Sequence, residues 1–504
     1  MIKKSIKFLF IQSEHENIGI EYLSANLKEA GHKAYLLFFP KPFDNVSIKF
    51  LKSNSTKENQ IIKNKILKYR PNVIAFSPFS SQYQWSIQKA QFIKKNFPKL
   101  FTLFGGVHIN SVPNIVINNK YVDGLIIGEA DQTIVDFANN FKTDKIFNIK
   151  SLWIKDKSKI IKNPISKLPT NLDKLTFPDK KIFYDQIPKS LQKTSYVIMA
   201  SRGCPFSCTY CSNNVYNKLY AGQKRLRFRS PKNIIDELIQ AKTKYSFDRV
   251  EFMDDVFAID EERLTKVLKL YQKHINIPFS CFLHPQFVNE NMVKLLKQSG
   301  CFWLKMGVQS ADENYRRKYL NRFETNQDLI RIAKLCHRYH LNFSFDHIFN
   351  LPKETKQHLI EAVRLYNLCS PTIINFGSLI YLPKTDIIKY GLQEKIINKK
   401  DVSNIELGID PIGQSSNINR LSHQSKHNQK INISAFSLLF IFTSISSKLV
   451  NFLMKIKFYN INLTIPNIII VFLKVISKIK AGQFYLYSSA IKATILYSFK
   501  KADF

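Results

Sequence analysis

Short apolar runs alternate with stretches of helical periodicity over the first 145 residues of the chain. The run KFLFI at 7–11 is compact and apolar, and helical spacing follows it up to Gly31. Buried strands that alternate with amphipathic helices predict a parallel, doubly wound sheet of the Rossmann-like (flavodoxin-like) kind. Such sheets bind ligands at the carboxyl ends of their strands. We therefore expect residues 1–148 to form an α/β ligand-binding domain.

A second series of strands and helices begins at 195-SYVIMAS-201 and continues through further apolar runs up to residue 381. Five or six strand–helix units in about two hundred residues predict a partial (β/α)6 TIM-like barrel, whose chemistry gathers at the carboxyl ends of its strands. We place this barrel at residues 191–395. The segment 149–190 holds prolines and lysines without a sustained period, and we interpret it as a linker.

The pattern changes again in the C-terminal region, residues 396–504. A polar stretch precedes strongly apolar, lysine-rich helical segments at 435–454 and 461–480. The longest uncharged run, 431–447, is shorter than the roughly 20 residues that a membrane-spanning helix needs, and Pro466 interrupts the second segment. Interfacial helices on a membrane and a helical cap that closes the barrel are the two alternatives.

The charge of the chain adds a constraint on partners rather than on fold. The sequence contains 75 Lys and Arg against 38 Asp and Glu, a net charge of +37. This excess favours anionic partners such as nucleic acid or an anionic membrane surface, and solvated surface lysines are the alternative explanation. The N-terminal run is typical of a first strand rather than of a signal peptide. We therefore expect a cytoplasmic protein, with membrane association through the C-terminal region as an option.

Three of the seven cysteines, Cys204, Cys208 and Cys211, lie within eight residues directly after a predicted strand. An odd number of cysteines does not indicate a disulfide framework, and structural zinc sites normally have four protein ligands. A cubic iron–sulfur cluster is usually held by four thiolates, so three would leave one iron open to a substrate or cofactor. A structural or zinc site remains the alternative. The other four cysteines are scattered singly: Cys281, Cys301, Cys336 and Cys369.

The CxxxCxxC loop, with Tyr210 before its last cysteine, resembles the radical S-adenosylmethionine (SAM) enzymes. The resemblance implies that Cys204, Cys208 and Cys211 hold a 4Fe-4S cluster whose open iron binds SAM and cleaves it to a 5′-deoxyadenosyl radical. It extends to 251-EFMDDVF-257 and 307-GVQSADE-313. The SAM-binding residues that it implies are Tyr210, Asp254, Asp255, Gln309, Ser310 and Arg322.

Several of these assignments have alternatives or departures. One of the two aspartates can be a helix N-cap instead, and Arg322 can be a surface arginine. Gln309 stands where many relatives have Glu, although an amide also hydrogen-bonds ribose hydroxyls. In 346-DHIFNLPKET-355, Asn350 and Lys353 replace glycines of the family, which puts a close backbone approach to adenine in doubt.

The N-terminal domain resembles the cobalamin-binding domains that precede radical SAM barrels, over 73–95, 104–113 and 123–133. For His108, a place on a surface turn is an equally good alternative to a contact with cobalamin. The DxHxxG motif of proteins that ligate cobalt through histidine is absent, and His15 is its nearest approximation, so we expect no histidine ligand of that type. The cobalamin-binding residues that the resemblance implies are Ser77, Gly105, Gly106, His108, Gly128 and Glu129.

Together the resemblances imply an enzyme that transfers a methyl group to an unactivated carbon of a lipid-like or secondary-metabolite substrate. Cyclisation, oxidation, rearrangement and a non-catalytic cobalamin or redox sensor are the alternatives. The expected partners are the small-molecule or lipid-like substrate, an electron donor such as flavodoxin or ferredoxin, and a membrane surface contacted peripherally. A methylthiotransferase acting on tRNA would explain the charge, but residues 1–150 contain no cysteine for its second cluster, so we do not expect nucleic acid. The sequence assigns no catalytic acid or base.

Overall fold

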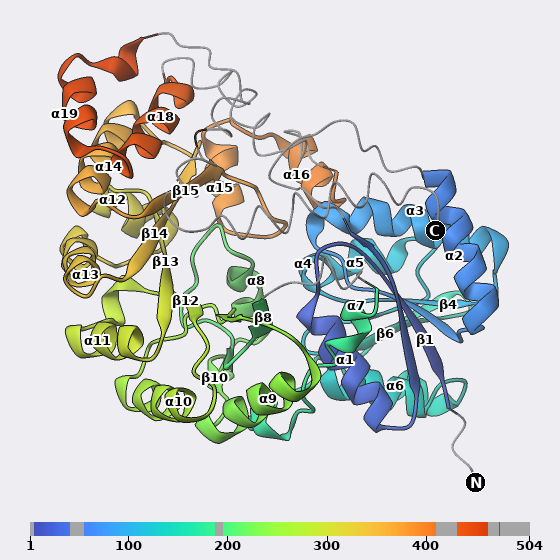
Figure 1. The fold of residues 1–504 in the computed structure, drawn as a ribbon. Helices are drawn as coiled ribbons and strands as arrows, with labels where there is room; N and C mark the ends of the chain where they lie inside the picture. Colours follow the sequence, from blue (N-terminus) through green and yellow to red (C-terminus); the bar gives the residue numbers. More distant parts are fainter. Residues whose placement is uncertain (1–4, 41–54, 187–194, 410–430, 462–472, 474–504) are drawn as a thin grey trace.

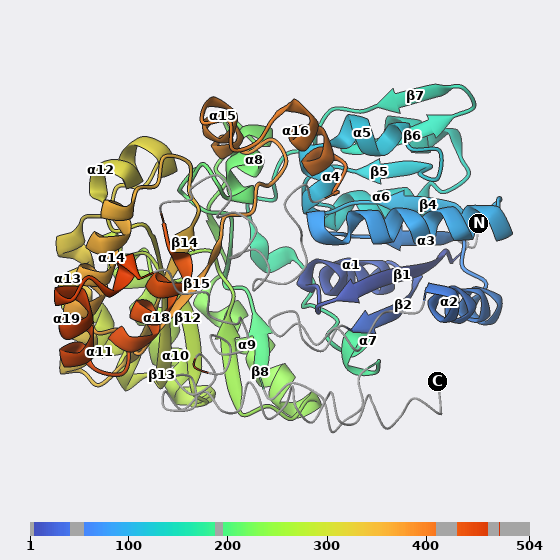
Figure 2. The same cartoon turned by 90° about the horizontal axis from the view of Figure 1, so that it is seen from above.

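A seven-stranded sheet forms the centre of the N-terminal domain, which lies beside a second α/β domain (Figure 1, Figure 2). The computed structural model describes residues 5–40, 55–186, 195–409, 431–461 and 473. The strand order is β2-β1-β3-β4-β5-β6-β7, and its first five strands are parallel. The order 2-1-3-4-5 is that of flavodoxin-like doubly wound folds, which confirms the prediction. These strands are β1 (Lys7–Glu14), β2 (Lys33–Pro40), β3 (Val73–Phe76), β4 (Phe101–Phe104) and β5 (Gly124–Ile126).

Helices cover both faces of this sheet because its strands are apolar on both sides. Successive side chains of a strand point to opposite faces, so in β1 Phe8 and Phe10 belong to one core while Leu9 and Ile11 belong to the other. The first core includes residues of α1 (Ile18–Glu29) and α6 (Asp131–Asn139). The second includes residues of α2 (Ser55–Tyr69), α3 (Tyr83–Asn96), α4 (Val107–Ser111) and α5 (Pro113–Asn118).

The segment 149–190, expected as a linker, extends the sheet instead. β6 (Leu152–Asp156) pairs antiparallel with β5, and β7 (Lys159–Lys162) pairs antiparallel with β6. Both strands are short, and lysines occupy both ends of β7, so no apolar run marks them in the sequence. The N-terminal domain therefore extends beyond residue 148: its sheet includes this hairpin, and its first core includes Ile182 and Phe183 of α7 (Lys181–Tyr184).

The second domain is a six-stranded parallel sheet in the order β15-β14-β13-β12-β11-β8, with helices between the strands. This topology confirms the predicted partial barrel. The strands are β8 (Ser195–Ile198), β11 (Arg249–Phe252), β12 (Phe279–Leu283), β13 (Cys301–Gln309), β14 (Asn342–Phe349) and β15 (Ile373–Ser378). The helices named below are α8 (Ser212–Leu219), α9 (Pro231–Lys244), α10 (Glu261–His274) and α14 (Lys356–Cys369). A two-stranded ribbon, β9 (Ser201–Arg202) with β10 (Arg227–Phe228), flanks the loop after β8.

The first apolar C-terminal segment caps the barrel. α18 (Ile433–Thr443) is apolar on all sides and packs against α14 and β15, next to α19 (Ser447–Lys455) (Figure 1). Its Phe440 is fully buried and contacts the rings of Phe349 and Tyr366. The cap is thus the correct alternative for 433–443, whereas most of 461–480 lies outside the described residues. Within the described ranges, every helix is too short or too polar to cross a bilayer.

The chain returns to the N-terminal domain after the barrel. α16 (Lys399–Glu406) lies beside that domain in Figure 2, and the carbonyl of Leu407 accepts a hydrogen bond from the Gln84 side chain. Gly408 has φ +65°, and a Cβ there would lie 2.9 Å from the carbonyl oxygen of Ser80. Since Ser80 follows β3 closely, this segment covers part of the carboxyl edge of the first sheet.

Candidate functional site

The three clustered cysteines lie on the loop between β8 and α8, at the carboxyl end of the barrel. Cys204 and Cys208 are buried and Cys211, the N-cap of α8, is partly buried. The loop begins at Gly203 with φ +84°, where a Cβ would lie 2.4 Å from the carbonyl oxygen of Arg225. Only glycine fits this close approach of the two chain segments.

The thiols lie close enough to influence one another. Burial, together with the charges of the neighbouring Asp255, Cys208 and Cys211, raises the pKa of Cys204 to about 12. Burial also raises the pKa of Cys208 and of Cys211. Three buried thiols are unfavourable as thiolates unless cationic metal offsets their charge. This set therefore fits a metal cluster bound through its sulfurs.

The cysteine loop supplies three thiols, which would leave one iron of a cubic cluster open. Across the described ranges no three His, Cys, Asp or Glu side chains form a site for a single metal ion. The remaining cysteines lie in the hydrophobic core of the barrel and not at this loop: Cys281, Cys301, Cys336 and Cys369.

A segment after β13 supports the cysteine loop from the other side. Thr209 donates its backbone N–H to the carbonyl of Leu320 (3.1 Å) and its hydroxyl to the carbonyl of Tyr319 (2.6 Å). Asn321 is in the left-handed conformation and donates its side-chain amide to the carbonyl of Ser207 (3.0 Å). Asn321, the neighbour of the predicted Arg322, thus lies against the cysteine loop.

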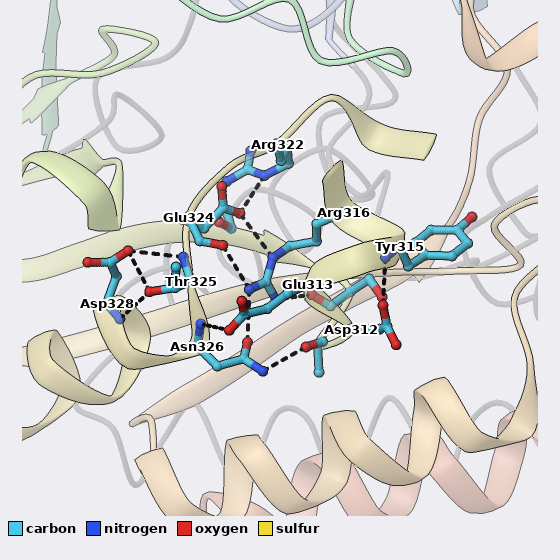
Figure 3. Close-up of polar contacts among 12 residues, drawn as sticks. Asp312, Glu313, Tyr315, Arg316, Arg322, Glu324, Thr325, Asn326 and Asp328 are labelled. Carbon is cyan, nitrogen blue, oxygen red and sulfur yellow. Dashed lines mark hydrogen bonds and ion pairs between the residues drawn. The ribbon is translucent and has the colours of Figure 1, made fainter. Parts of the chain in front are cut away.

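Arg322 is a buried residue of the site, which corrects the alternative of a surface arginine. Its guanidinium donates to the Gly307 carbonyl (2.7 Å), to the Tyr210 hydroxyl (3.3 Å) and to the Sγ of Cys208 (3.8 Å). It also pairs with the Glu324 carboxylate at 2.7 Å (Figure 3). The charge of Arg322 therefore faces the sulfur, the tyrosine and the strand end together.

Three further charged or titratable residues behind Arg322 carried no recognisable motif. Glu324 is buried; burial opposes its ionisation, but His284 and Arg322 lower its pKa to about 2. His284 lies 3.4 Å from Glu324 and stacks on Phe206 of the cysteine loop, with ring centroids 4.0 Å apart. Arg316, which is fully buried, donates to the Ser310 and Glu324 carbonyls (Figure 3). Neither spacing nor composition distinguishes these residues in the sequence.

The structure separates the two aspartates after β11. Asp254 is buried and accepts hydrogen bonds from the backbone N–H of Ala200 (3.1 Å) and from the Ser201 hydroxyl. Burial raises its pKa to about 6 against these bonds. Asp255 instead lies near the cysteines, where its charge raises the pKa of Cys204 and Cys211. Asp255 is thus the better placed of the two for a ligand at the cysteine loop, and neither caps α10, whose N-cap is Asp260.

Gln309 and Ser310 lie at the carboxyl end of β13. Gln309 has φ +67°, and its amide nitrogen would be 2.6 Å from a Cβ at Gly307, so glycine makes room for this amide. Ser310 is buried and its carbonyl accepts from Arg316 (2.7 Å). Both residues stay predictions as SAM contacts.

Two residues of the turn after β14 have left-handed backbone conformations although neither is a glycine. Asn350 and Lys353 have φ +60° and +62°. Asn350 donates its side-chain amide to Ser378 (3.0 Å) and its backbone N–H to Glu354 (2.8 Å). The two residues thus adopt left-handed conformations that glycine reaches without strain.

At the carboxyl edge of the N-terminal sheet, Ser77 faces the turn Gly105–Gly106. Gly106 has φ +94°, and a Cβ there would lie 2.8 Å from the Ser77 hydroxyl oxygen. Asn17, the N-cap of α1, donates to the Ser77 carbonyl (3.2 Å). This edge combines small residues with backbone groups, which fits the close approach of a ligand such as cobalamin.

His108 is fully buried, so the alternative of a surface turn is wrong. Its Nδ1 lies 3.0 Å from the Ser80 hydroxyl, and its ring stacks on Tyr83 with centroids 4.3 Å apart. Burial lowers its pKa to about 4, so the imidazole is neutral at physiological pH. His15, in contrast, is exposed just after β1.

Gly128 and Glu129 face the barrel domain. A Cβ at Gly128 would overlap the hydroxyl of Tyr220, the C-cap of α8, and this hydroxyl accepts a hydrogen bond from the backbone N–H of Glu129 (2.9 Å). The Glu129 carboxylate pairs with Arg202 and Arg227. Its role as a cobalamin contact stays a prediction.

Comparison with known protein families identifies both domains. Residues 198–366 match the model of the radical SAM superfamily, and residues 9–138 match that of the B12 binding domain. The two matched ranges contain all the residues predicted above for cluster, SAM and cobalamin.

Curated relatives and solved structures match this chain over much of its length. An uncharacterized methyltransferase of Pyrococcus horikoshii is 24% identical over 339 residues, covering 66% of this chain and 72% of the relative. An anaerobic magnesium-protoporphyrin IX monomethyl ester cyclase of Rubrivivax gelatinosus is 20% identical over 399 residues, covering 76% of this chain and 70% of the cyclase. The structure of the cobalamin-dependent S-adenosylmethionine radical enzyme OxsB, with aqua-cobalamin and S-adenosylmethionine bound, has a TM-score of 0.64 at 14% identity and covers 98% of this chain and 79% of that chain. This last likeness establishes a shared fold.

Proposed function

This chain belongs to the radical SAM superfamily and carries a B12-binding domain ahead of its barrel, and from this premise we propose that it transfers a methyl group to an unactivated carbon atom of its substrate. Its cofactors are a 4Fe-4S cluster, SAM and cobalamin. The observation that carries the proposal is the contact between two carboxyl edges. Glu129, just after β5, and Arg202, just before the cysteine loop, form an ion pair at 3.1 Å.

In this proposal the cysteine loop holds the cluster and its neighbours hold SAM. Cys204, Cys208 and Cys211 bind iron, and Arg322 steadies the loop through its contacts to Cys208 and Tyr210. Asp255 offers a carboxylate to the SAM amino group. The remaining assigned contacts to SAM are those of Tyr210, Asp254, Gln309, Ser310 and Arg322.

The first sheet supplies the second cofactor site. Ser77, Gly105 and Gly106 form its small-residue turn, and the neutral His108 lies behind it beneath α16. When bound, the cluster supplies the electron that cleaves SAM, and cobalamin supplies the methyl group. The protein's own part is to orient both groups and to exclude water between the two domains.

Anaerobic reconstitution tests the proposal directly. The chain is supplied with iron, sulfide and cobalamin, and then with SAM and a reductant such as reduced flavodoxin. We expect iron–sulfur and corrin absorbance together with release of 5′-deoxyadenosine. Cys208→Ala should lose the cluster and the release of 5′-deoxyadenosine, whereas Cys336→Ala, a core cysteine far from the loop, should retain both.

Two results would contradict the proposal. Cluster assembly without cleavage of SAM would indicate a sensor or a degenerate enzyme. Cleavage of SAM by a chain that retains no corrin would indicate a radical enzyme without cobalamin-dependent methyl transfer.

Ring formation is a second candidate function, because the cyclase of Rubrivivax gelatinosus covers 76% of this chain. Mass spectrometry of the product separates the two reactions. Methyl transfer to carbon replaces a hydrogen atom with a methyl group, so the product is heavier than the substrate by CH2. Oxidative ring closure yields a product that has lost hydrogen.

A lipid-like substrate is supported by the surface of α19. Leu449, Phe452 and Ile456 lie on one helical face at spacings of three and four residues, and Phe452 is 58% exposed. Lys448 and Lys455 flank this face. Exposed apolar side chains beside lysines favour contact with an anionic membrane surface.

Co-sedimentation with phosphatidylglycerol vesicles tests this membrane contact. We expect salt-sensitive binding that Phe452→Asp weakens, because the charge disfavours insertion of the apolar face. Leu67→Asp is the matched control, since Leu67 is 56% exposed on α2 of the other domain. Equal binding by both variants would exclude α19 as the contact surface.

A further inference from the structure

A group of ion pairs joins the two domains at the cysteine loop. At its centre the Glu129 carboxylate, which is 14% exposed, accepts hydrogen bonds from Arg202 (3.1 Å), Arg227 (3.1 Å) and the Tyr216 hydroxyl. Burial opposes ionisation of Glu129, but the bonds and charges of Arg227 and Arg202 lower its pKa below its usual range. Glu129 is therefore an anion whose oxygens are occupied by the barrel domain.

Arg202 is bound by the N-terminal domain on three sides. It forms two hydrogen bonds with Asp131 of α6 (2.6 and 3.1 Å) and one with Glu129. Its guanidinium also lies over the ring of Tyr22 of α1, 4.8 Å from the centroid. Two-pronged contacts of this kind fix the orientation of an arginine as well as its position.

All the donors to Glu129 come from the segment that brackets the three cysteines. Arg202 precedes Cys204 by two residues, and Tyr216 follows Cys211 on α8. Arg202 and Arg227 face each other across the β9–β10 ribbon, which closes the loop at its base. The N-terminal domain thus contacts the cluster loop on both sides of its metal ligands in the sequence.

Such a network contributes more to geometry than to net stability. The free-energy cost of removing two charges from water is about as large as the attraction between them in a buried ion pair. A displacement of about 1 Å between reacting groups, however, lowers rates by roughly 100-fold. Two cofactors bound in different domains must therefore be held at a fixed distance from each other.

We propose that Glu129, Asp131, Arg202 and Arg227 are positioning residues that hold the cluster loop at one fixed separation from the cobalamin site. The inference rests on the proposed function for the identity of the two cofactors. It assigns Glu129 to the domain contact in place of a direct contact with cobalamin. The ion pairs themselves are independent of any cofactor.

Electron paramagnetic resonance measures this separation. Cob(II)alamin and the reduced cluster each carry an unpaired electron, so their spin–spin coupling reports the distance between them. We expect one defined coupling in the wild-type holoenzyme. Glu129→Gln and Arg202→Met should broaden it at unchanged corrin and iron content, and Arg202→Lys, which keeps the charge, should broaden it less. Lys218→Gln is the control, since it removes an ion pair of α8 that stays within the barrel domain.

Three outcomes would overturn the inference. Unchanged coupling in both Glu129→Gln and Arg202→Met would show that the network does not set the separation. Loss of corrin from Glu129→Gln alone would assign Glu129 to cobalamin. Broadening in Lys218→Gln equal to that in Arg202→Met would show a general effect of altering this region.

Hydrogen exchange on the metal-free chain keeps the inference testable without cofactors. Peptides spanning 203–216 should exchange faster in Glu129→Gln and Arg202→Met than in the wild type or Lys218→Gln. Equal exchange in all four proteins would overturn the inference. A wild-type chain that retains no corrin would instead contradict the proposed function, whatever the exchange data show.

Discussion

Single residues of the turn after β14 adopt left-handed conformations that usually favour glycine. Lys353 has φ +62° and pairs with Glu394 at 3.0 Å in a partly exposed ion pair. The left-handed conformation costs a non-glycine residue about 1–2 kcal/mol. The turn is therefore held by its surroundings, including the bond from Asn350 to Ser378.

Replacing Lys353 tests this explanation. Lys353→Ala and Lys353→Gly both remove the ion pair, but only glycine adopts φ +62° without strain. We expect the glycine variant to be more stable than the alanine variant by about 1 kcal/mol in urea denaturation. Equal stability would mean that the turn relaxes to a different backbone conformation.

The neighbouring Glu354 gives the stability of the chain a defined pH dependence. Burial raises its pKa from 4.5 to about 8. The unfolded chain releases this proton near pH 4.5, whereas the folded chain keeps it until about pH 8, so the contribution of Glu354 to stability is full below pH 4.5 and falls across that interval. Glu354→Gln has no such loss. We expect the melting temperature of this variant to rise relative to that of the wild type as the pH increases from 5 to 8. A constant difference between the two melting temperatures would contradict the assignment.

At the scale of elements, the sequence predicts the helices and strands that have an apolar pattern and misses those that lack one. The parallel strands and their helices follow from compact apolar runs. The sequence predicts a linker in place of the β6–β7 hairpin, because the short strands of this hairpin include lysines at the sheet edge. α18 was recognised as an apolar helix, but amphipathicity alone could not decide between membrane and barrel, since its partners on α14 and β15 are brought together only by the fold.

The cap role of α18 predicts a large effect of one residue. Phe440 is fully buried against Phe349 and Tyr366, so Phe440→Ala should cost about 3–5 kcal/mol of unfolding free energy. Phe452→Ala on the exposed face of α19 should change it by about 0.5 kcal/mol or less. Denaturation with urea measures both. Similar effects of the two variants would contradict the cap.

At the scale of the whole molecule, a second buried ion pair ties the segment between the domains to both of them. Lys180 is fully buried, lies 2.6 Å from Glu21 of α1, and stacks over the ring of Tyr196 on β8, 5.3 Å from its centroid. Lys180 also lies 3.2 Å from Glu16, whose side chain is 6% exposed. Lys180→Met should cost about 3–5 kcal/mol because it removes the cation that Glu21 and Glu16 share. Adding Glu21→Gln should recover part of this loss, since the carboxylate of Glu16 remains and has lost Lys180. Simple additivity of the two changes would contradict the coupling.

The candidate site divides along similar lines. The cysteines and the Asp-Asp, Gln-Ser and Gly-Gly elements could be proposed from the sequence because each resembles a family motif that is continuous in sequence. Other features could not be predicted from the sequence, because they depend on contacts between segments far apart in the chain. These features are the environment of Arg322, the burial of His108 and the contacts of Glu324 and His284. The pairing of Glu129 with Arg202 crosses two domains and has no local pattern at all.

The order of these partners along the chain has a consequence for biosynthesis. Glu129 and Asp131 belong to a domain whose sheet and helices are complete before residue 202 leaves the ribosome, and domains generally fold as units during synthesis. The cysteine loop then emerges next to a finished surface that already carries the anions for its arginines. We expect the newly made N-terminal domain to act as a template on which the cluster loop takes its shape before iron arrives.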